Sequence, residues 1–516
     1  MEIKRSSGVL LHITSLPGRL GIGTLGTEAE EFASSLKKAG FRYWQILPIG
    51  PVEGAFGFSP YASTSTFAGN ILFISLEKMA GRPWFPEFFD RQKFMDEPVV
   101  RFEKVLEHKA GVLKTAAANF FRLATGKEAA DYERFCAESK DWLDDYALFS
   151  AVAGAYGTNN WLKWDARISM REPAALKEWA EKLEGEVKFH RFCQYVFFRQ
   201  WDSFRRTCAS NGVRIIGDIP IYINLESADA WANPGILQLD RKNGRPVSVA
   251  GVPPDYFSET GQRWGNPLYV WEDDKGFLNE DTFRWWRGRI SHLSGLFDII
   301  RIDHFRGFAG YWSIPAEEKT AVNGEWIKGP GMEFFHRLKK DLGDLPLIAE
   351  DLGVITPDVE ELRDGLGLPG MKILQFAFDF NNKNYYLPHN IMDPNCVLYT
   401  GTHDNNTTNG WFYGDEIDDA TRRYVLEYIG ADGFSDLHWK LIRQAYRTTA
   451  RLVIVPAQDL LGYGREFRMN TPGTIDGNWA WKLTAGAITD GIVSKLRAMG
   501  EMYDRIREDK KVENGD

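Results

Sequence analysis

The sequence predicts a (β/α)8 barrel, in which eight parallel strands form a ring and each strand is followed by a helix. Eight short apolar segments recur along the 516 residues at the spacing of helical crossovers. Helical periodicity lies between these segments, and most of them run directly into a carboxylate. The length suits one barrel with insertions or roughly two to four domains. We expect residues 1–516 to form a single catalytic domain.

The first part of the chain predicts two strands and one helix. Residues 8–15 have the apolar pattern of a buried strand, and residues 27–40 have the pattern of an amphipathic helix. Glycines within 21–26 match G-x-G-x-x-G, which occurs in dinucleotide sites. Such a site also needs a carboxylate at the end of the next strand. The next strand, 43–48, ends without one, so no dinucleotide site is expected.

Two long insertions interrupt the early strands. Residues 70–212 are mostly helical by pattern and too long for a simple connection, which predicts an inserted helical subdomain between the second and third strands. Residues 224–296 form a second insertion, between the third and fourth strands. It contains 251–267, a loop rich in Gly, Pro and aromatic residues. Long loops without secondary structure are usually functional lids or disordered, and the aromatic residues argue against disorder.

The later strands follow at regular intervals. The third to eighth strands are predicted at 213–223, 297–303, 345–351, 371–378, 396–404 and 451–461. Helices between them are predicted at 332–342, 356–364 and 436–449.

Carboxylates gather where these strands end. They are Asp218, Asp303, Glu350, Asp379, Asp404 and Asp459. In a (β/α)8 barrel the active site lies at the carboxyl ends of the strands. Helix capping explains one or two polar residues at strand ends. It does not explain six acids on one rim, which is therefore the predicted active site.

The segment 297–307 carries the predicted nucleophile. Alternation along a strand places Arg301 and Asp303 on the same side. A neighbouring guanidinium favours an ionised carboxylate and is expected to lower its pKa. A positioned, ionised Asp is what covalent catalysis needs. The structural alternative is an Arg–Asp pair that only caps the strand end.

Asp303 and Glu350 end neighbouring strands, which lie about 4.8 Å apart. Their carboxylates are expected about 5–5.5 Å from each other, the separation of retaining glycoside chemistry. Asp303 would attack the anomeric carbon, while Glu350 would act as acid and then as base. Asp404 would accept hydrogen bonds from sugar hydroxyls, and His304 and His403 would donate them.

Composition excludes several classes of function. The net charge is −9, from 62 basic and 71 acidic residues without a strongly basic block, so no nucleic-acid partner is expected. The 4 cysteines are widely spaced, which predicts free thiols in a reducing cytoplasm rather than a zinc site or disulfides. No apolar run suits a signal peptide or a membrane span. Residues 379–384 begin like a calcium loop but carry Lys383 at the fifth position and lack the glycine at the sixth, so no metal or cofactor is expected. The charged tail 507–516 is expected to fray.

Five segments together match one known family. They are Arg301-Ile-Asp303-His304-Phe-Arg-Gly, Ala-Glu350-Asp-Leu-Gly, Thr-His403-Asp404-Asn, the loop 251–267, and Met469-Asn470-Thr-Pro-Gly with the Asn478-Trp479 pair. From residue 8 to about 481 the chain resembles glycoside hydrolase family 77 of the α-amylase clan, the 4-α-glucanotransferases or amylomaltases. The first three segments resemble the nucleophile, acid/base and transition-state-stabilising strands of that family, and the loop is its most specific feature.

The resemblance implies a barrel without the C-terminal β-domain of amylases and without a required metal. The implied reaction moves a segment of a 1,4-α-glucan to the 4-hydroxyl of an acceptor glucan or glucose, with maltooligosaccharides and amylose as substrates. The residues implied to contact sugar are Ser59, Tyr61, Asp218, Arg301, His304 and Asp379, with Gln262 and Trp264 in the lid.

Two other functions stay open on the sequence. One is an α-glucan hydrolase on the same fold, and the other is a glucan-binding protein on an inactive barrel. Transfer rather than hydrolysis needs a held acceptor and a largely dry site, for which Tyr61 and Trp264 are the candidate residues. Monomer and homodimer, donor chain length, cyclic products, the working temperature and the role of the helical insertion are also left open.

Overall fold

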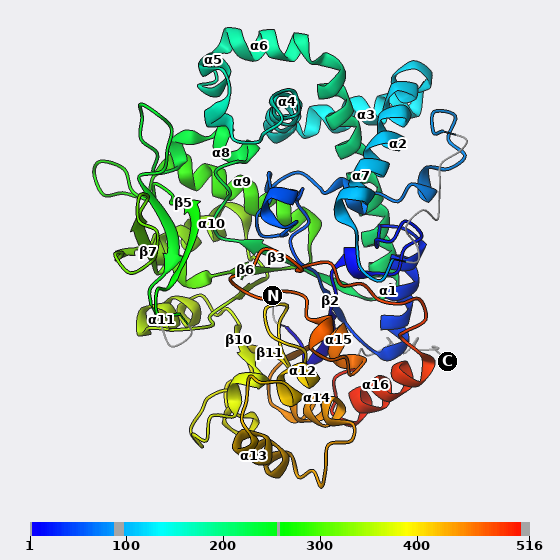
Figure 1. The fold of residues 1–516 in the computed structure, drawn as a ribbon, viewed down its shortest axis with the longest axis vertical. Coiled ribbons are helices and arrows are strands. Elements are labelled where there is room, and N and C mark those ends of the chain that lie inside the picture. Colours follow the sequence, from blue (N-terminus) through cyan, green and yellow to red (C-terminus); the bar gives the residue numbers. More distant parts are fainter. Residues whose placement is uncertain (1–2, 87–96, 255–257, 507–516) are drawn as a thin grey trace, which may run out of the picture.

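The predicted (β/α)8 barrel is confirmed. The computed structural model describes residues 3–86, 97–254 and 258–506. Eight parallel strands form one sheet that curls nearly into a closed barrel, surrounded by helices (Figure 1). In spatial order the strands are β10 (Gly370–Ile373), β11 (Cys396–Tyr399), β12 (Leu452–Pro456), β1 (Ser6–Leu10), β2 (Tyr43–Gln45), β3 (Arg214–Pro220), β6 (Ile299–Asp303) and β9 (Leu347–Ala349). At the seam the Ala349 amide donates to the Pro369 carbonyl at 3.0 Å.

Each barrel strand lies within or beside a predicted apolar segment, but several end early. β10 stops at Ile373 and is followed by the 3-10 helix η8 (Leu374–Ala377). β12 stops at Pro456 and is followed by α15 (Ala457–Leu460). Residues in both continuations are buried. A short apolar run cannot distinguish a strand from a buried helical turn, which is why the predicted ends were too long.

The outer helices follow the predicted periodicity. α1 (Thr27–Ala39) buries one apolar face and ends at Gly40, whose φ of 79° provides the left-handed cap common after helices. The other helices around and after the later strands are α8 (Ala228–Ala232), α9 (Glu280–Leu296), α10 (Gly331–Leu342), α11 (Pro357–Gly365), α12 (Thr408–Tyr413), α13 (Asp419–Ile429), α14 (Leu437–Arg447) and α16 (Asp490–Met502). In the described part of the chain no strand follows β12.

In the described part of the long segment between β2 and β3, α-helices begin at residue 102 and form the upper part of Figure 1. They are α2 (Phe102–Leu123), α3 (Lys127–Glu138), α4 (Lys140–Tyr156), α5 (Ala166–Ser169), α6 (Pro173–Lys182) and α7 (Glu184–Ser210). α7 also packs on the barrel, because Phe204 contacts Trp44 of β2 and Trp201 contacts Phe297. Residues 87–96 of this insertion lie outside the described residues.

A second, antiparallel sheet stands beside the barrel. Its order is β5 (Gln262–Pro267), β4 (Ser248–Val252), β7 (Gly310–Pro315) and β8 (Glu325–Lys328). The expectation that 251–267 has no secondary structure is therefore wrong at its second half, and β7 and β8 were not predicted. These strands lack apolar alternation, and pairing decides their form: β5 and β7 pair with β4, and β8 pairs with β7. Residues 255–257 of this loop, and the tail 507–516, lie outside the described residues.

Candidate active site

A cleft of about 690 Å³ opens beside the carboxyl ends of β3 and β6. Eight of the predicted site residues line it: Ser59, Tyr61, Gln262, Trp264, Asp303, His304, His403 and Asp404. They come from the loop after β2, from β5, from the end of β6 and from the loop after β11. The predicted rim thus brings together residues far apart in the chain.

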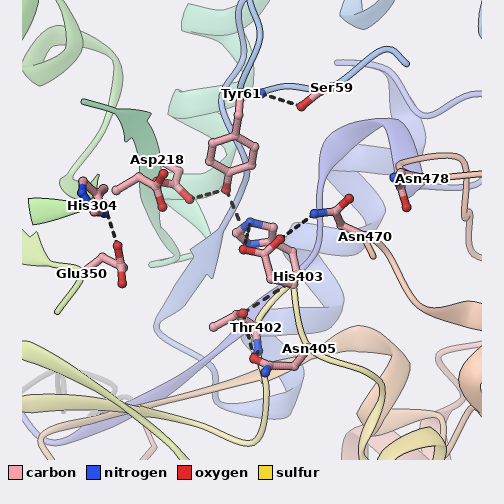
Figure 2. A network of polar contacts seen from close by, with 12 residues as sticks. Ser59, Tyr61, Asp218, His304, Glu350, Thr402, His403, Asn405, Asn470 and Asn478 are labelled. Carbon is pink, nitrogen blue, oxygen red and sulfur yellow. Dashed lines mark hydrogen bonds and ion pairs between the residues drawn. The ribbon is translucent and has the colours of Figure 1, made fainter. Parts of the chain in front are cut away.

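Buried charged side chains lie beneath this cleft and are hydrogen-bonded to residues of its wall. β3 pairs with β6 so that Asp218 lies opposite Arg301. Arg301 Nη1 donates to both Asp218 carboxylate oxygens at 2.7 Å and lies 3.0 Å from Asp303 Oδ1. The Tyr61 hydroxyl donates to Asp218 Oδ2 at 2.8 Å (Figure 2). The predicted proximity of Arg301 and Asp303 is confirmed, and Asp218 is the second carboxylate on that guanidinium.

Glu350 lies directly after β9, beside the strand that carries Asp303. β6 and β9 are parallel neighbours with Ile302 opposite Ala349, so Asp303 and Glu350 follow paired residues, as predicted. The His304 amide donates to Glu350 Oε2 at 2.6 Å, and the Leu352 amide donates to Oε1 at 2.9 Å (Figure 2). Both carboxylate oxygens are therefore oriented by the backbone.

The side chain of the next residue, Asp351, points away from the cleft. It is buried and accepts from Arg363 Nη1 at 2.5 Å and from the Met371 amide at 2.6 Å. Successive side chains of an extended segment point to opposite sides, which accounts for this orientation. Asp351 thus stabilises the wall of the barrel and does not take part in the cleft.

The two acids have raised pKa values, one more than the other. Burial raises the pKa of Glu350 to about 8, and the nearby Asp303 carboxylate adds to the shift. Burial also raises the pKa of Asp303 to about 6, although Arg301 opposes the shift. The expectation of a lowered Asp303 pKa is wrong, because burial outweighs the opposing effect of Arg301, and the negative charges of Asp218 and Asp404 add to the rise. Water in the open cleft reaches 29% of the Asp303 side chain and moderates this shift. Near neutral pH the pair favours ionised Asp303 and protonated Glu350.

Asp404 lies beyond the end of β11, on the opposite side of the cleft. Asn470 Nδ2 donates to its Oδ1 at 2.7 Å, and His403 Nε2 is 3.3 Å from its Oδ2. Arg468 Nη2 donates to the Asp404 carbonyl at 2.5 Å. The His403 ring stacks on Tyr61 at 5.0 Å, so the walls of the cleft are joined (Figure 2). The Asp404 side chain remains 46% exposed, which leaves its carboxylate available to a ligand.

The predicted lid residues Gln262 and Trp264 lie on β5. Trp264 Nε1 donates to Gln262 Oε1 at 3.1 Å, and the indole meets the His304 ring edge-on at 4.7 Å. Burial lowers the pKa of His304 to about 3, so this ring is neutral. His304 Nε2 is buried and has no hydrogen-bond partner within the described residues. It is a polar atom at the cleft wall that a ligand hydroxyl would satisfy.

Of the six predicted rim acids, Asp303 and Asp404 line this cleft, whereas Asp218, Glu350, Asp379 and Asp459 are not among the described residues that line it. Asp459 is buried in α15, where it accepts from the Thr400 and Thr408 hydroxyls at 2.5 and 2.7 Å and from the Thr408 amide, so the rim prediction is wrong there. Asp379 follows η8 instead of ending a strand, and is exposed. It accepts from the Asn381 amide at 3.0 Å and is not among the described residues that line the cleft.

Some cleft residues were not predicted as site residues. They include Phe56, Tyr222, Asn470 and Trp479. Asn470 and Trp479 belong to segments that had matched the family, and that match was the available signal. Nothing in the local pattern marked Phe56 or Tyr222.

Two features are absent from the described residues. No group of three or more His, Cys, Asp or Glu side chains there has an arrangement that would hold a metal ion. No helix there has the length and apolar character needed to cross a bilayer.

Comparison with known proteins agrees with this geometry. The sequence profile of glycoside hydrolase 77, described as 4-alpha-glucanotransferase, matches residues 11–488. The chain belongs to this family. The 4-alpha-glucanotransferase of Synechocystis is 47% identical over 507 residues, covering 97% of this chain and 98% of the relative. That of Thermus thermophilus is 44% identical, covering 98% of this chain and all of the relative.

Solved structures support the same family. Amylomaltase from Streptococcus agalactiae in complex with acarbose superposes with a TM-score of 0.92 at 38% identity, covering 98% of this chain and 100% of that one. Amylomaltase from Corynebacterium glutamicum, at 19% identity and a TM-score of 0.76 over 96% of this chain and 75% of that one, shares the fold. The reaction class of the family is 4-alpha-glucan transfer, and a hydrolase on this fold is not favoured.

Proposed function

We propose that Asp303, Glu350 and Asp404 transfer a segment of a 1,4-α-glucan to the 4-hydroxyl of an acceptor glucan or glucose by retaining double displacement. The observation that carries this is the pair at the tips of β6 and β9, where the Asp303 pKa is about 6 and the Glu350 pKa about 8. Two acids whose environments separate their pKa values divide the roles of nucleophile and proton donor.

In the first step Asp303 attacks the anomeric carbon and the glycosidic C–O bond breaks. Glu350 gives its proton to the leaving oxygen, and the glucan segment becomes an ester of Asp303. In the second step Glu350 takes the proton of the acceptor 4-hydroxyl, whose oxygen displaces Asp303. Asp404, oriented by Asn470, accepts hydrogen bonds from ring hydroxyls that strengthen as the sugar flattens.

Substrate contact is proposed for the walls of the cleft. The residues are Ser59, Tyr61, Gln262, Trp264, His304 and His403, with Asp218 and Arg301 beneath them. Asp379 is retained on the resemblance alone, as a contact outside the cleft. Maltooligosaccharides and amylose are the proposed donors, in keeping with the acarbose in the Streptococcus agalactiae relative. The mechanism uses no metal or cofactor.

The organisation around the site is part of the proposal. Residues 70–212 act as a helical subdomain, and 251–267 within the insertion 224–296 act as the lid of one catalytic domain, 1–516. We place the reaction in the cytoplasm, which the four free cysteines suit.

Maltotriose tests the reaction. Transfer yields glucose and longer maltooligosaccharides while the number of reducing ends stays constant, whereas hydrolysis raises that number.

Asp303→Asn is expected to abolish nearly all turnover while maltooligosaccharide binding, measured by calorimetry, persists. Unchanged turnover would indicate a binding protein or a different nucleophile.

Glu350→Gln tests the second acid. Its rate on maltotriose is expected to fall by about 10²–10⁴-fold, the usual contribution of general acid–base help. A loss smaller than about tenfold would remove Glu350 from this role.

A further inference from the structure

The turn that follows Asp303 is anchored from below by two phenylalanines. Phe305 and Phe308 of the 3-10 helix η7 (Phe305–Phe308) are three residues apart and therefore share one face. Both are fully buried against α10, with Phe308 at 5.1 Å from Phe334 and Phe305 at 5.6 Å from Phe335. This packing leaves Arg306 on a different face of the same turn.

Arg306 reaches the loop that follows Glu350. Its Nη1 donates to the Val354 carbonyl, and its Nη2 donates to the Thr356 hydroxyl at 3.3 Å. Both acceptors lie between β9 and α11, in the segment that begins with Glu350. At the other end of that segment the Phe305 amide donates to the Glu350 carbonyl at 3.1 Å. The two loops that carry the proposed acids are thus joined at both ends.

The antiparallel sheet covers this arginine. Trp326 of β8 lies over the guanidinium, with the ring centroid 4.0 Å from its central carbon, and Arg306 is only 7% exposed. Trp312 of β7 packs edge-on against Trp326 at 5.3 Å. A cation over an aromatic ring, shielded from water, has few other positions available. β7 and β8 therefore confine Arg306 to the contact with the Glu350 loop.

We propose that Arg306 is a positioning residue for the acid/base carboxylate of Glu350, and that the antiparallel sheet acts on the reaction through Trp326. The amides that orient Glu350 belong to His304 and Leu352, one on each of the two loops that Arg306 ties together. Loss of that tie lets the loops separate and moves the proton donor away from the leaving oxygen. This inference depends on the proposed role of Glu350.

The test compares two donors that differ in their need for an acid. Maltotriose needs a proton on its leaving oxygen, whereas α-maltotriosyl fluoride releases fluoride without one. For Arg306→Met, kcat for maltotriose transfer is expected to fall by about 10–100-fold, while KM changes by less than about threefold. The burst of fluoride release, which reports the first step, is expected to change by less than about threefold. Arg306→Lys should recover part of the loss, and Trp326→Leu should show the same selectivity more weakly.

Arg337→Met is the matched control. Arg337 lies 3.9 Å from the ring of Phe283 and donates to Glu280 at 2.7 Å, so it repeats the arginine-on-aromatic arrangement on α10 away from the two loops. Its rates on both donors should equal those of the wild type. Thermal unfolding of each variant reports folding, and Arg306→Lys and Trp326→Leu carry the test if Arg306→Met does not fold.

Two outcomes would overturn the inference. Equal losses on both donors would mean general structural damage, and no loss on either would mean that Arg306 has no role. Glu350→Gln, run in parallel, separates the inference from the proposed function. If that variant lacks the selectivity for the fluoride donor, the acid/base assignment itself fails. If it has the selectivity and Arg306→Met does not, only the inference about Arg306 fails.

Discussion

At the scale of single residues, the site depends on how Arg301 is shared. Arg301 Nη1 donates to both carboxylate oxygens of Asp218 and also lies beside Asp303. The ionised form of Asp303 is therefore stabilised less than it would be if Arg301 paired with Asp303 alone. Local sequence predicted the contact with Asp303. It did not predict the competition, because Asp218 comes from another strand. A nucleophile with a pKa near 6 stays ionised at neutral pH while Glu350 remains protonated.

The pH dependence of kcat/KM should be bell-shaped. Activity should rise as Asp303 loses its proton near pH 6 and fall as Glu350 loses its proton near pH 8. These values describe the pair as a whole. Initial rates of maltotriose transfer across pH 4–10 check the profile, and a flat profile between about pH 5 and 9 would contradict the assignment.

Asp218→Asn should shift the acidic limb of that profile to lower pH. The Asp218 charge raises the Asp303 pKa, and its removal also frees Arg301 for Asp303. Both changes favour ionised Asp303. Glu181→Gln, on the exposed face of α6, serves as a charge-matched control that should leave the profile unchanged. An acidic limb that stays in place or moves to higher pH would show that Asp218 does not set the Asp303 pKa.

At the scale of elements, β5 gives part of the predicted loop 251–267 the form of a strand at the wall of the cleft. Its pairing with β4 places Trp264 against His304, and Gln262 accepts a hydrogen bond from the Trp264 indole. The indole is 39% exposed and lines the cleft, so it can cover a bound sugar and keep water from the glycosyl-enzyme. The proposed role of the lid is therefore to favour the sugar acceptor over water.

Trp264→Ala should raise the ratio of hydrolysis to transfer. Without the indole, water reaches the ester of Asp303 more easily and the acceptor is held less well. Reducing-end assays and chromatography of maltotriose products measure the two rates together. Trp264→Phe retains an aromatic ring and should stay nearer the wild-type ratio. An unchanged ratio in the alanine variant would show that the lid does not control partition.

At the scale of the whole molecule, one buried arginine ties the end of the described chain to the floor of the barrel. Arg505 is fully buried and donates to the carbonyls of Ser6, Tyr446, Thr448 and Ala450 at 2.8–3.2 Å. Ser6 begins β1 and Ala450 precedes β12. This latch therefore lies at the amino ends of the strands, opposite the catalytic cleft.

Arg505→Met should destabilise the protein by roughly 3–5 kcal/mol, because four buried carbonyls lose a charged donor. The midpoint of urea unfolding checks this loss. Transfer activity at 25 °C should remain near the wild-type value, since the latch is far from the cleft. Arg497→Met removes an exposed ion pair with Glu501 and should have almost no effect on stability. A midpoint for Arg505→Met equal to that of Arg497→Met would contradict the latch.

The sequence by itself determined the barrel, the order of its strands and the assignment of Asp303 and Glu350 to neighbouring strand tips. Those features follow from local periodicity and from the rule that consecutive βα units lie side by side. Only the tertiary structure decided that Asp459 is an internal hydrogen-bond acceptor, that Asp379 lies outside the cleft, and that burial raises the Asp303 pKa. The reason is physical: hydrogen bonding, burial and pKa are set by distant segments, such as Thr400, Thr408 and Asp218, whose approach no local pattern records.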